Sequence, residues 1–157
     1  MIDLRFIYAI LLSILPVSEL RGGLIYASLN GLNPLASFLI CTTANILVIF
    51  LIFFFLDKIN HLFLRIRFYK RFFDKYLEIL HKKIDKFEEK YSAVGFLALV
   101  FFTAIPIPII GGAWTAVLIS WILDLDRRKS ILAISLGVVI AGILISIGTF
   151  GLASLLH

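Results

Sequence analysis

The residues best suited to chemistry lie in one stretch near the start of the chain, Leu15-Pro16-Val17-Ser18-Glu19-Leu20-Arg21-Gly22-Gly23. Inside an apolar run it combines a carboxylate, Glu19, and a guanidinium, Arg21, with a proline and two glycines. A charged side chain at membrane depth costs roughly 2.5–3.5 kcal/mol on insertion scales and usually marks a path for protons or substrate. Irregular backbone is tolerated there only inside protein or beside a wet cavity. The stretch therefore predicts either a surface loop or the tip of a broken helix that enters the membrane and returns.

A second stretch repeats this plan in the other half of the chain. Ile105-Pro106-Ile107-Pro108-Ile109-Ile110-Gly111-Gly112 again joins two apolar limbs through prolines and a glycine pair. The pairs Gly22-Gly23 and Gly111-Gly112 lie 89 positions apart, and Pro16 and Pro106 lie 90 apart. Matched breaks in the two halves of a membrane protein point to a transporter site built from an internal repeat. We therefore predict that these stretches, the first break and the second break, are the tips of two re-entrant hairpins.

Composition favours a membrane protein with no separate soluble domain. The chain has 157 residues, of which 61% are hydrophobic, and its mean hydropathy is +1.05, whereas soluble domains are about 45–50% apolar. The net charge of +5, from 15 basic and 10 acidic side chains, indicates orientation in a membrane rather than binding of nucleic acid. The single cysteine, Cys41, excludes an internal disulfide, and we interpret it as a small packing residue.

The segments between the breaks predict a spanning helix and a linker. Asn33-Pro34 provides an N-cap residue and a proline at the first helical position, and the 22 residues 35–56 carry no charge, which is long enough to span. Asn45 near its middle predicts either an interhelical hydrogen bond or a polar group that lines a cavity. Residues 57–91 hold ten Lys/Arg and six Asp/Glu, with apolar residues every three or four positions. They predict a basic amphipathic helix, single or folded as a hairpin, at the membrane surface.

The second half predicts the same order of elements. Trp114, beside the second break, is expected to pack against it, and Trp121 is expected to be an interfacial anchor. A charged turn follows, in which Asp126 is a suitable N-cap for the last spanning helix. Small residues recur at four-residue steps along that helix, at Ala133, Gly137 and Ala141. They predict a close-packing face, which is compatible with a homodimer.

Charge decides between a re-entrant and a spanning path for each broken segment. If each segment re-enters, the linker and the turn Arg127-Arg128-Lys129 fall on one side, which places 13 of the 15 basic residues in the cytoplasm. The predicted fold is therefore an all-α integral membrane protein that contains an inverted repeat. Its parts are a first repeat at 1–56 (re-entrant hairpin 4–32, transmembrane helix 35–56), an amphipathic cytoplasmic linker at 57–91, and a second repeat at 92–157 (re-entrant hairpin 92–123, transmembrane helix 130–156).

Two motifs carry a resemblance to a known family. Glu19-Leu20-Arg21-Gly22-Gly23, together with the run from Phe101 to Pro108 before Gly111-Gly112-Ala113-Trp114, resembles the small multidrug export protein family, a distant relative of the DedA/VTT (SNARE-associated) superfamily. The resemblance covers nearly the whole chain and implies two re-entrant hairpins in the plasma membrane of a prokaryote. It also implies proton-coupled transport, with Glu19 and Arg21 matching an acidic residue and an arginine of the DedA-like relatives. The segment 92–123 carries no charge, so an arginine of the DedA pattern is missing there.

Three function classes follow, in order of preference. The first is a proton-coupled exporter of drug-like small molecules, the second a flippase or scramblase of lipids or lipid phosphates, and the third an intramembrane enzyme. The third lacks a nucleophile–base or metal-spaced set near the three histidines, so we expect no enzyme activity, cofactor or metal. The expected partners are the bilayer and a small-molecule or lipid substrate. The predicted site residues are Glu19 and Arg21 for substrate and proton coupling; Pro16, Gly22, Gly23, Pro106, Pro108, Gly111 and Gly112 for hairpin-tip backbone, whose N–H groups could meet an anion; and Asn45, Thr103 and Trp114 for cavity lining.

Overall fold

The computed structural model describes residues 3–63, 88–105 and 112–156, and the only regular secondary structure within them is helical. They are α1 (Leu4–Ile14), α2 (Glu19–Leu29), α3 (Pro34–Phe63), α5 (Glu88–Ala104), α6 (Ala113–Ile122) and α7 (Arg127–Leu156). The predicted all-α class is confirmed. Two stretches, Pro34–Lys58 and Arg127–Gly151, are long and apolar enough to cross a membrane, with mean hydropathies of 2.7 and 2.6.

Side-chain caps set where the long helices begin. The Ala36 N–H donates to Asn33 Oδ1 at 3.0 Å, and the Lys129 N–H donates to Asp126 Oδ1 at 2.9 Å. Each cap accepts from an N–H group that has no partner inside its helix. The predicted N-cap roles of Asn33 and Asp126 are therefore confirmed.

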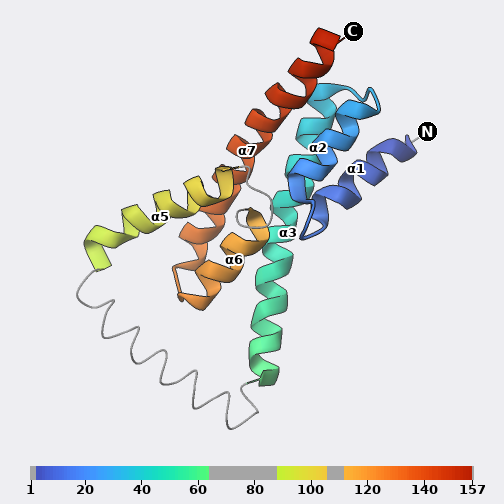
Figure 1. Cartoon of the computed structure of the whole chain (residues 1–157). Coiled ribbons are helices and arrows are strands. Elements are labelled where there is room, and N and C mark those ends of the chain that lie inside the picture. Colours follow the sequence, from blue (N-terminus) through green and yellow to red (C-terminus); the bar gives the residue numbers. More distant parts are fainter. Residues whose placement is uncertain (1–2, 64–87, 106–111, 157) are drawn as a thin grey trace.

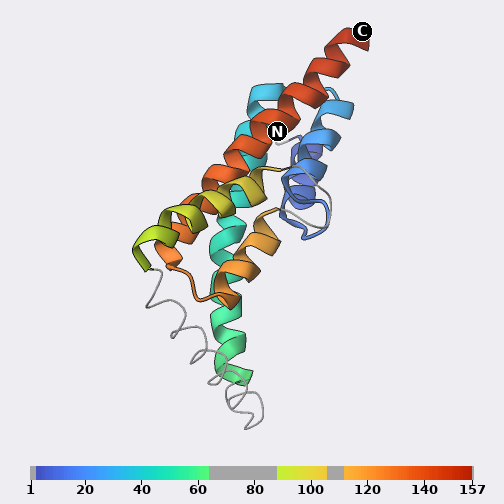
Figure 2. The same cartoon turned by 60° about the vertical axis from the view of Figure 1, so that its left-hand side comes forward.

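The two long helices form the centre, and the short helices lie in pairs beside them (Figure 1). The α1–α2 pair packs on α3 and α7, and α5 and α6 also pack on α7. In both views the open end of the α1–α2 pair points toward the end of the molecule where α7 finishes (Figures 1 and 2). The α5–α6 pair opens toward the opposite end, where α3 runs on past Asp57.

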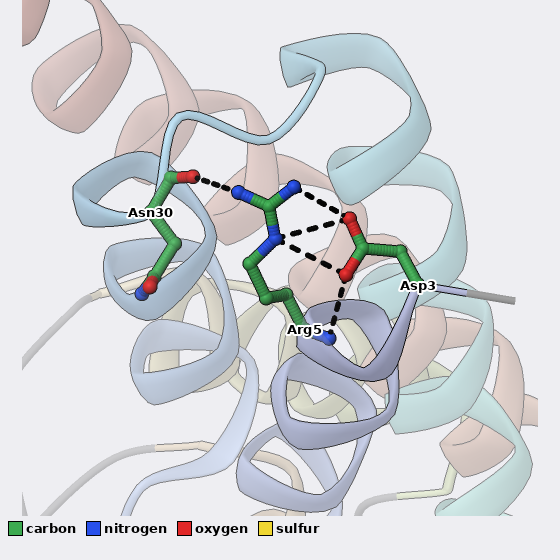
Figure 3. A network of polar contacts seen from close by, with 3 residues as sticks. All are labelled: Asp3, Arg5 and Asn30. Carbon is green, nitrogen blue, oxygen red and sulfur yellow. Dashed lines mark hydrogen bonds and ion pairs between the residues drawn. The ribbon is translucent and has the colours of Figure 1, made fainter.

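A polar clamp closes the open end of the α1–α2 pair (Figure 3). The Arg5 guanidinium donates to the Asn30 carbonyl oxygen at 3.0 Å and forms an ion pair with Asp3 at 2.7 Å. The hydrogen bonds from Arg5 hold the pKa of Asp3 below its usual value. The clamp ties the start of α1 to the end of α2, so these two helices run antiparallel.

A second clamp joins the C-terminal part of α3, at Asp57, to the start of α7. The Arg127 guanidinium forms an ion pair with the Asp57 carboxylate and lies 5.1 Å from the centre of the Phe53 ring. The Trp121 indole N–H donates to Asp57 Oδ1 at 3.3 Å. Asp57 is held by these two contacts, and α3 runs past the predicted end of the helix at residue 56 to Phe63. The charged turn before α7 therefore lies at the same end of the molecule as the end of α3.

The small-residue face of α7 packs inside the chain. Ala133, Gly137 and Ala141 are all buried. A Cβ placed on Gly137 would lie 2.5 Å from Thr103 Cβ and 2.8 Å from the Val100 carbonyl oxygen of α5. The predicted close-packing face is confirmed, and at Gly137 it packs on α5 of the same chain. The homodimer stays a prediction.

Candidate functional site at the junction of the two breaks

The first break is shorter than predicted, because α2 begins at Glu19 and includes both glycines. The Gly22 N–H donates to the Ser18 carbonyl oxygen at 2.9 Å, so it is not available to an anion. A Cβ on Gly23 would overlap the Ser13 hydroxyl and the Ala9 carbonyl oxygen of α1. The predicted role of Gly22 and Gly23 as exposed tip backbone is therefore wrong, since Gly23 allows α1 and α2 to pack closely.

All four carbonyl groups in the last turn of α1 find partners, and each partner is different. The Leu11 oxygen accepts from the Leu15 N–H at 3.3 Å, and the Leu12 oxygen accepts from the Ser18 hydroxyl at 2.6 Å. The Ser13 oxygen accepts from Asn45 Nδ2 at 2.7 Å, and the Ile14 oxygen accepts from Trp114 Nε1 at 3.1 Å. Helix ends normally leave these groups to caps or water. This helix end is satisfied by protein groups from α3, α6 and the break itself.

Glu19 reaches from the first break to the start of α6. Its carboxylate oxygen Oε1 accepts from the Trp114 backbone N–H at 3.2 Å. The Ala113 backbone N–H also donates to this carboxylate. The first turn of a helix carries partial positive charge, which stabilises an anion placed there. The Glu19 residue is 7% exposed, so this contact lies inside the protein.

The backbone at this contact is unusual on both sides. Glu19 has φ +48° and Gly112, the N-cap residue of α6, has φ +132°. Residues other than glycine rarely adopt positive φ, and they hold it only where the surrounding structure fixes it. A Cβ on Gly112 would overlap the Glu19 carboxylate. Gly112 is therefore required twice, for its backbone angle and for the space that the carboxylate fills.

Arg21 makes the complementary contact with the other limb of the second break. Its guanidinium donates to the Ile105 carbonyl oxygen at 3.3 Å, just beyond the end of α5. The end of a helix carries partial negative charge, which stabilises a cation. The carboxylate thus meets the start of one helix and the guanidinium meets the end of another. The arrangement can accept a proton on Glu19 or exchange these partners for polar groups of a bound molecule.

Of the residues predicted to line a cavity, the described structure places Asn45 and Thr103 in packed interfaces. Asn45 is 1% exposed and makes the interhelical hydrogen bond to Ser13, which was one of its two interpretations. The Thr103 hydroxyl donates to the Leu99 oxygen of its own helix at 2.8 Å. Trp114 does pack at a break, but its indole reaches the first break rather than its own.

Some predicted site residues lie outside the described residues, and two site residues were not predicted. Pro106, Pro108 and Gly111 belong to the first group, and Pro16 lies in the described connection between α1 and α2. The sequence did not lead us to predict that Ser13 and Ser18 take part in the hydrogen bonds at the end of α1. Their positions on either side of Pro16 are the one signal that could have indicated it.

Comparison with known proteins supports the membrane interpretation. The family model described as "Putative small multi-drug export protein" matches residues 19–144. A comparison with curated proteins and one with solved structures each find no match. The matched region begins at Glu19, within the first break, and contains α3, the second break and residues 127–144 of α7. Because this model covers most of the sequence, the chain belongs to the small multi-drug export protein family.

Proposed function

We propose that the protein is a multi-pass plasma-membrane transporter that couples movement of a small molecule to proton binding at Glu19. In this proposal α1–α2 and α5–α6 are re-entrant hairpins of an inverted repeat, and the two breaks meet near the middle of the bilayer. Glu19 and Arg21 hold the breaks together until a proton or substrate displaces their contacts. The family name and the two apolar helices support a membrane exporter.

The observation that carries the proposal is the complete pairing of the carbonyl groups at the end of α1. In the bilayer core no water is present to satisfy a helix end, so irregular backbone there must find protein partners or line a wet cavity. The partners of the Ser13 and Ile14 carbonyls are an amide and an indole from distant parts of the chain. Such pairing is what a helix that ends inside the membrane requires.

The position of the break along α3 supports the same depth. Asn45, which bonds to Ser13, lies 12 residues after the cap Asn33 and 12 residues before the clamp residue Asp57. At 1.5 Å per residue each of these two segments is roughly 18 Å long. The first break therefore lies near the middle of this part of α3, which begins at the polar cap Asn33 and ends at the charged Asp57, as suits the two membrane surfaces.

The charges at the breaks support proton coupling. Poor hydration of a carboxylate stabilises its protonated, neutral form, whereas a nearby cation and a helix N-terminus stabilise its charged form. Glu19 is subject to all of these influences, since it is buried, lies beside Arg21 and caps α6. A change in its surroundings during transport would therefore change its proton occupancy.

The test is proton movement in everted vesicles that contain the full chain. A pH gradient is imposed, and proton release is followed with a fluorescent dye after addition of ethidium or of other lipophilic compounds in turn. We expect compound-dependent proton release that Glu19→Gln abolishes and Asp124→Asn, an exposed control at φ +51°, leaves intact. Equal proton release from Glu19→Gln and the unaltered chain would exclude Glu19 as the coupling group. Head-group flux without any proton dependence would instead favour a lipid scramblase.

A further inference from the structure

The outer rim of the first break is exposed although its inner side is fully bonded. Leu15, Pro16 and Val17 are all exposed, and Val17 is 83% exposed. These residues lie between α1 and α2 and have no helical backbone. If the break lies at membrane depth, as the proposed function requires, this rim cannot face lipid, because lipid offers no partner to irregular backbone.

Two kinds of surroundings can satisfy such a rim, namely other protein or water. The neighbouring charged residue favours water. Arg21 follows the rim by four residues, and its side chain is only partly buried. Arg21 stays partly exposed even though it donates to the Ile105 carbonyl oxygen and lies near Glu19. An exposed cation at membrane depth is expensive in lipid and favours water-filled space.

We infer that water reaches the first break from the linker end of the molecule, across the rim formed by Leu15, Pro16 and Val17. The rim lies at the closed end of the α1–α2 pair, which points toward the end of the molecule where α3 runs past Asp57 (Figures 1 and 2). Glu19 lies two residues beyond Val17. Water that reaches the rim in this conformation therefore approaches the buried Glu19 from the linker side, which is the cytoplasmic side in the predicted topology.

Cysteine reactivity tests this inference without any assay of transport. In a chain with Cys41→Ala, single cysteines are placed by Val17→Cys and Leu47→Cys. Leu47 is a matched control, because it is 63% exposed, lies on helical backbone and is two residues from Asn45, which contacts the first break. The probe is a charged methanethiosulfonate, which cannot cross the membrane. It reacts with the cysteine thiolate, and a cysteine ionises to the thiolate readily in water but not in lipid.

We expect Val17→Cys to react at least ten times faster than Leu47→Cys, and only from the side that also labels Leu125→Cys in the charged turn. A rate as low as that of Leu47→Cys would overturn the inference, because the rim would then be in lipid or protein. A disulfide between two copies at Val17→Cys would overturn it in favour of a second copy. Labelling from the opposite side would overturn the stated direction of access.

One outcome would contradict both this inference and the proposed placement of the site at membrane depth. If Val17→Cys reacted as fast as Leu125→Cys, the first break would lie in bulk water rather than at membrane depth. The inference and the proposed placement of the site would then both fail. Slow or one-sided labelling leaves that placement standing, so the two failures are distinguishable. Elution of each variant as a single species in detergent checks that it is folded.

Discussion

At the scale of single residues, the main feature of the candidate site is the Glu19 carboxylate, which packs against Gly112. Glu19 and Gly112 both have positive φ, and the carboxylate occupies the space where a side chain on Gly112 would lie. Positive φ in a residue with a side chain costs of order 1 kcal/mol or more and needs support from its surroundings. The contact with the first turn of α6 supplies that support, so the geometry of Glu19 and the start of α6 depend on each other.

This dependence predicts unequal effects of two glycine substitutions. Gly31 also has positive φ, +64°, but nothing lies within 4 Å of a Cβ placed there. Gly31→Ala should cost roughly 1–2 kcal/mol from the backbone angle alone. Gly112→Ala should cost roughly twice that or more, because its backbone angles (φ +132°, ψ 178°) are nearly restricted to glycine and its Cβ would clash with Glu19. Unfolding by sodium dodecyl sulfate in mixed micelles measures both. Equal losses would show that the carboxylate can move aside freely.

At the scale of elements, the end of α1 shows how a helix can stop inside the protein. Pro16 prevents the helix from continuing, and the freed carbonyls are taken up by a hydroxyl, an amide and an indole. These donors come from the break, from α3 and from α6. The first break is therefore a junction of several elements rather than a local turn.

The two tryptophans of α6 provide a test of the surroundings of this junction. The Trp114 indole bonds to the Ile14 carbonyl oxygen at the break, and the Trp121 indole bonds to Asp57 beside the charged turn. Trp114→Phe should cost about 0.6–1.7 kcal/mol, the range for hydrogen bonds within membranes. Trp121→Phe should cost less, because water at the surface can replace its bond. Equal or reversed losses in micelle unfolding would contradict a dry inner side of the junction, where the Trp114 indole bonds to Ile14.

A second test at this scale concerns the contact of α5 with α7. Gly137→Ala places a methyl group against Thr103 and the Val100 carbonyl oxygen, which should cost roughly 1–3 kcal/mol as overpacking does elsewhere. Gly148→Ala is the control, because it lies on the same helix with open space around it. It should stabilise the helix by about 0.5–1 kcal/mol. The two changes should therefore shift the unfolding midpoint in opposite directions, and shifts of the same sign would contradict close packing of α5 on α7.

At the scale of the whole molecule, two polar clamps mark opposite ends. Arg5 joins α1 to the end of α2 at one end, and Arg127 joins α7 to the end of α3 at the other. Between them, large apolar side chains such as Phe50, Leu51 and Phe54 face outward from α3. This sequence of layers suits a bilayer, with its surfaces at the level of the clamps.

The clamps predict the sidedness of two loops. In the re-entrant topology Gly31, before α3, and Leu125, before α7, lie on opposite sides of the membrane. Single cysteines are placed at these positions in a Cys41→Ala chain and treated with an impermeant maleimide. One cysteine should react only in right-side-out vesicles and the other only in everted vesicles. If both react in the same orientation, each broken segment spans the membrane, and the inverted repeat is excluded.

Much of the fold follows from the sequence, because the signals that carry it are local. Uncharged runs of sufficient length predict α3 and α7, and Asn33, Pro34 and Asp126 fix where they begin. The motif around Glu19 also indicated the family. The relationship to DedA proteins, the re-entrant path and proton coupling stay predictions.

The contacts between the two breaks depend on tertiary structure alone. Whether Asn45 lines a cavity or bonds to Ser13 is decided by the neighbour of α3, which lies 32 positions away in the chain. The two glycine pairs look alike in the sequence, but their glycines have different roles. Gly22 and Gly23 pack within a helix pair, whereas Gly112 leaves space for the carboxylate of Glu19, 93 positions earlier in the sequence. The sequence by itself determined the apolar segments, their caps and the presence of two charges in the first break, since these depend on neighbouring residues. Only the tertiary structure decided which helix end each charge meets, because that depends on how distant segments pack.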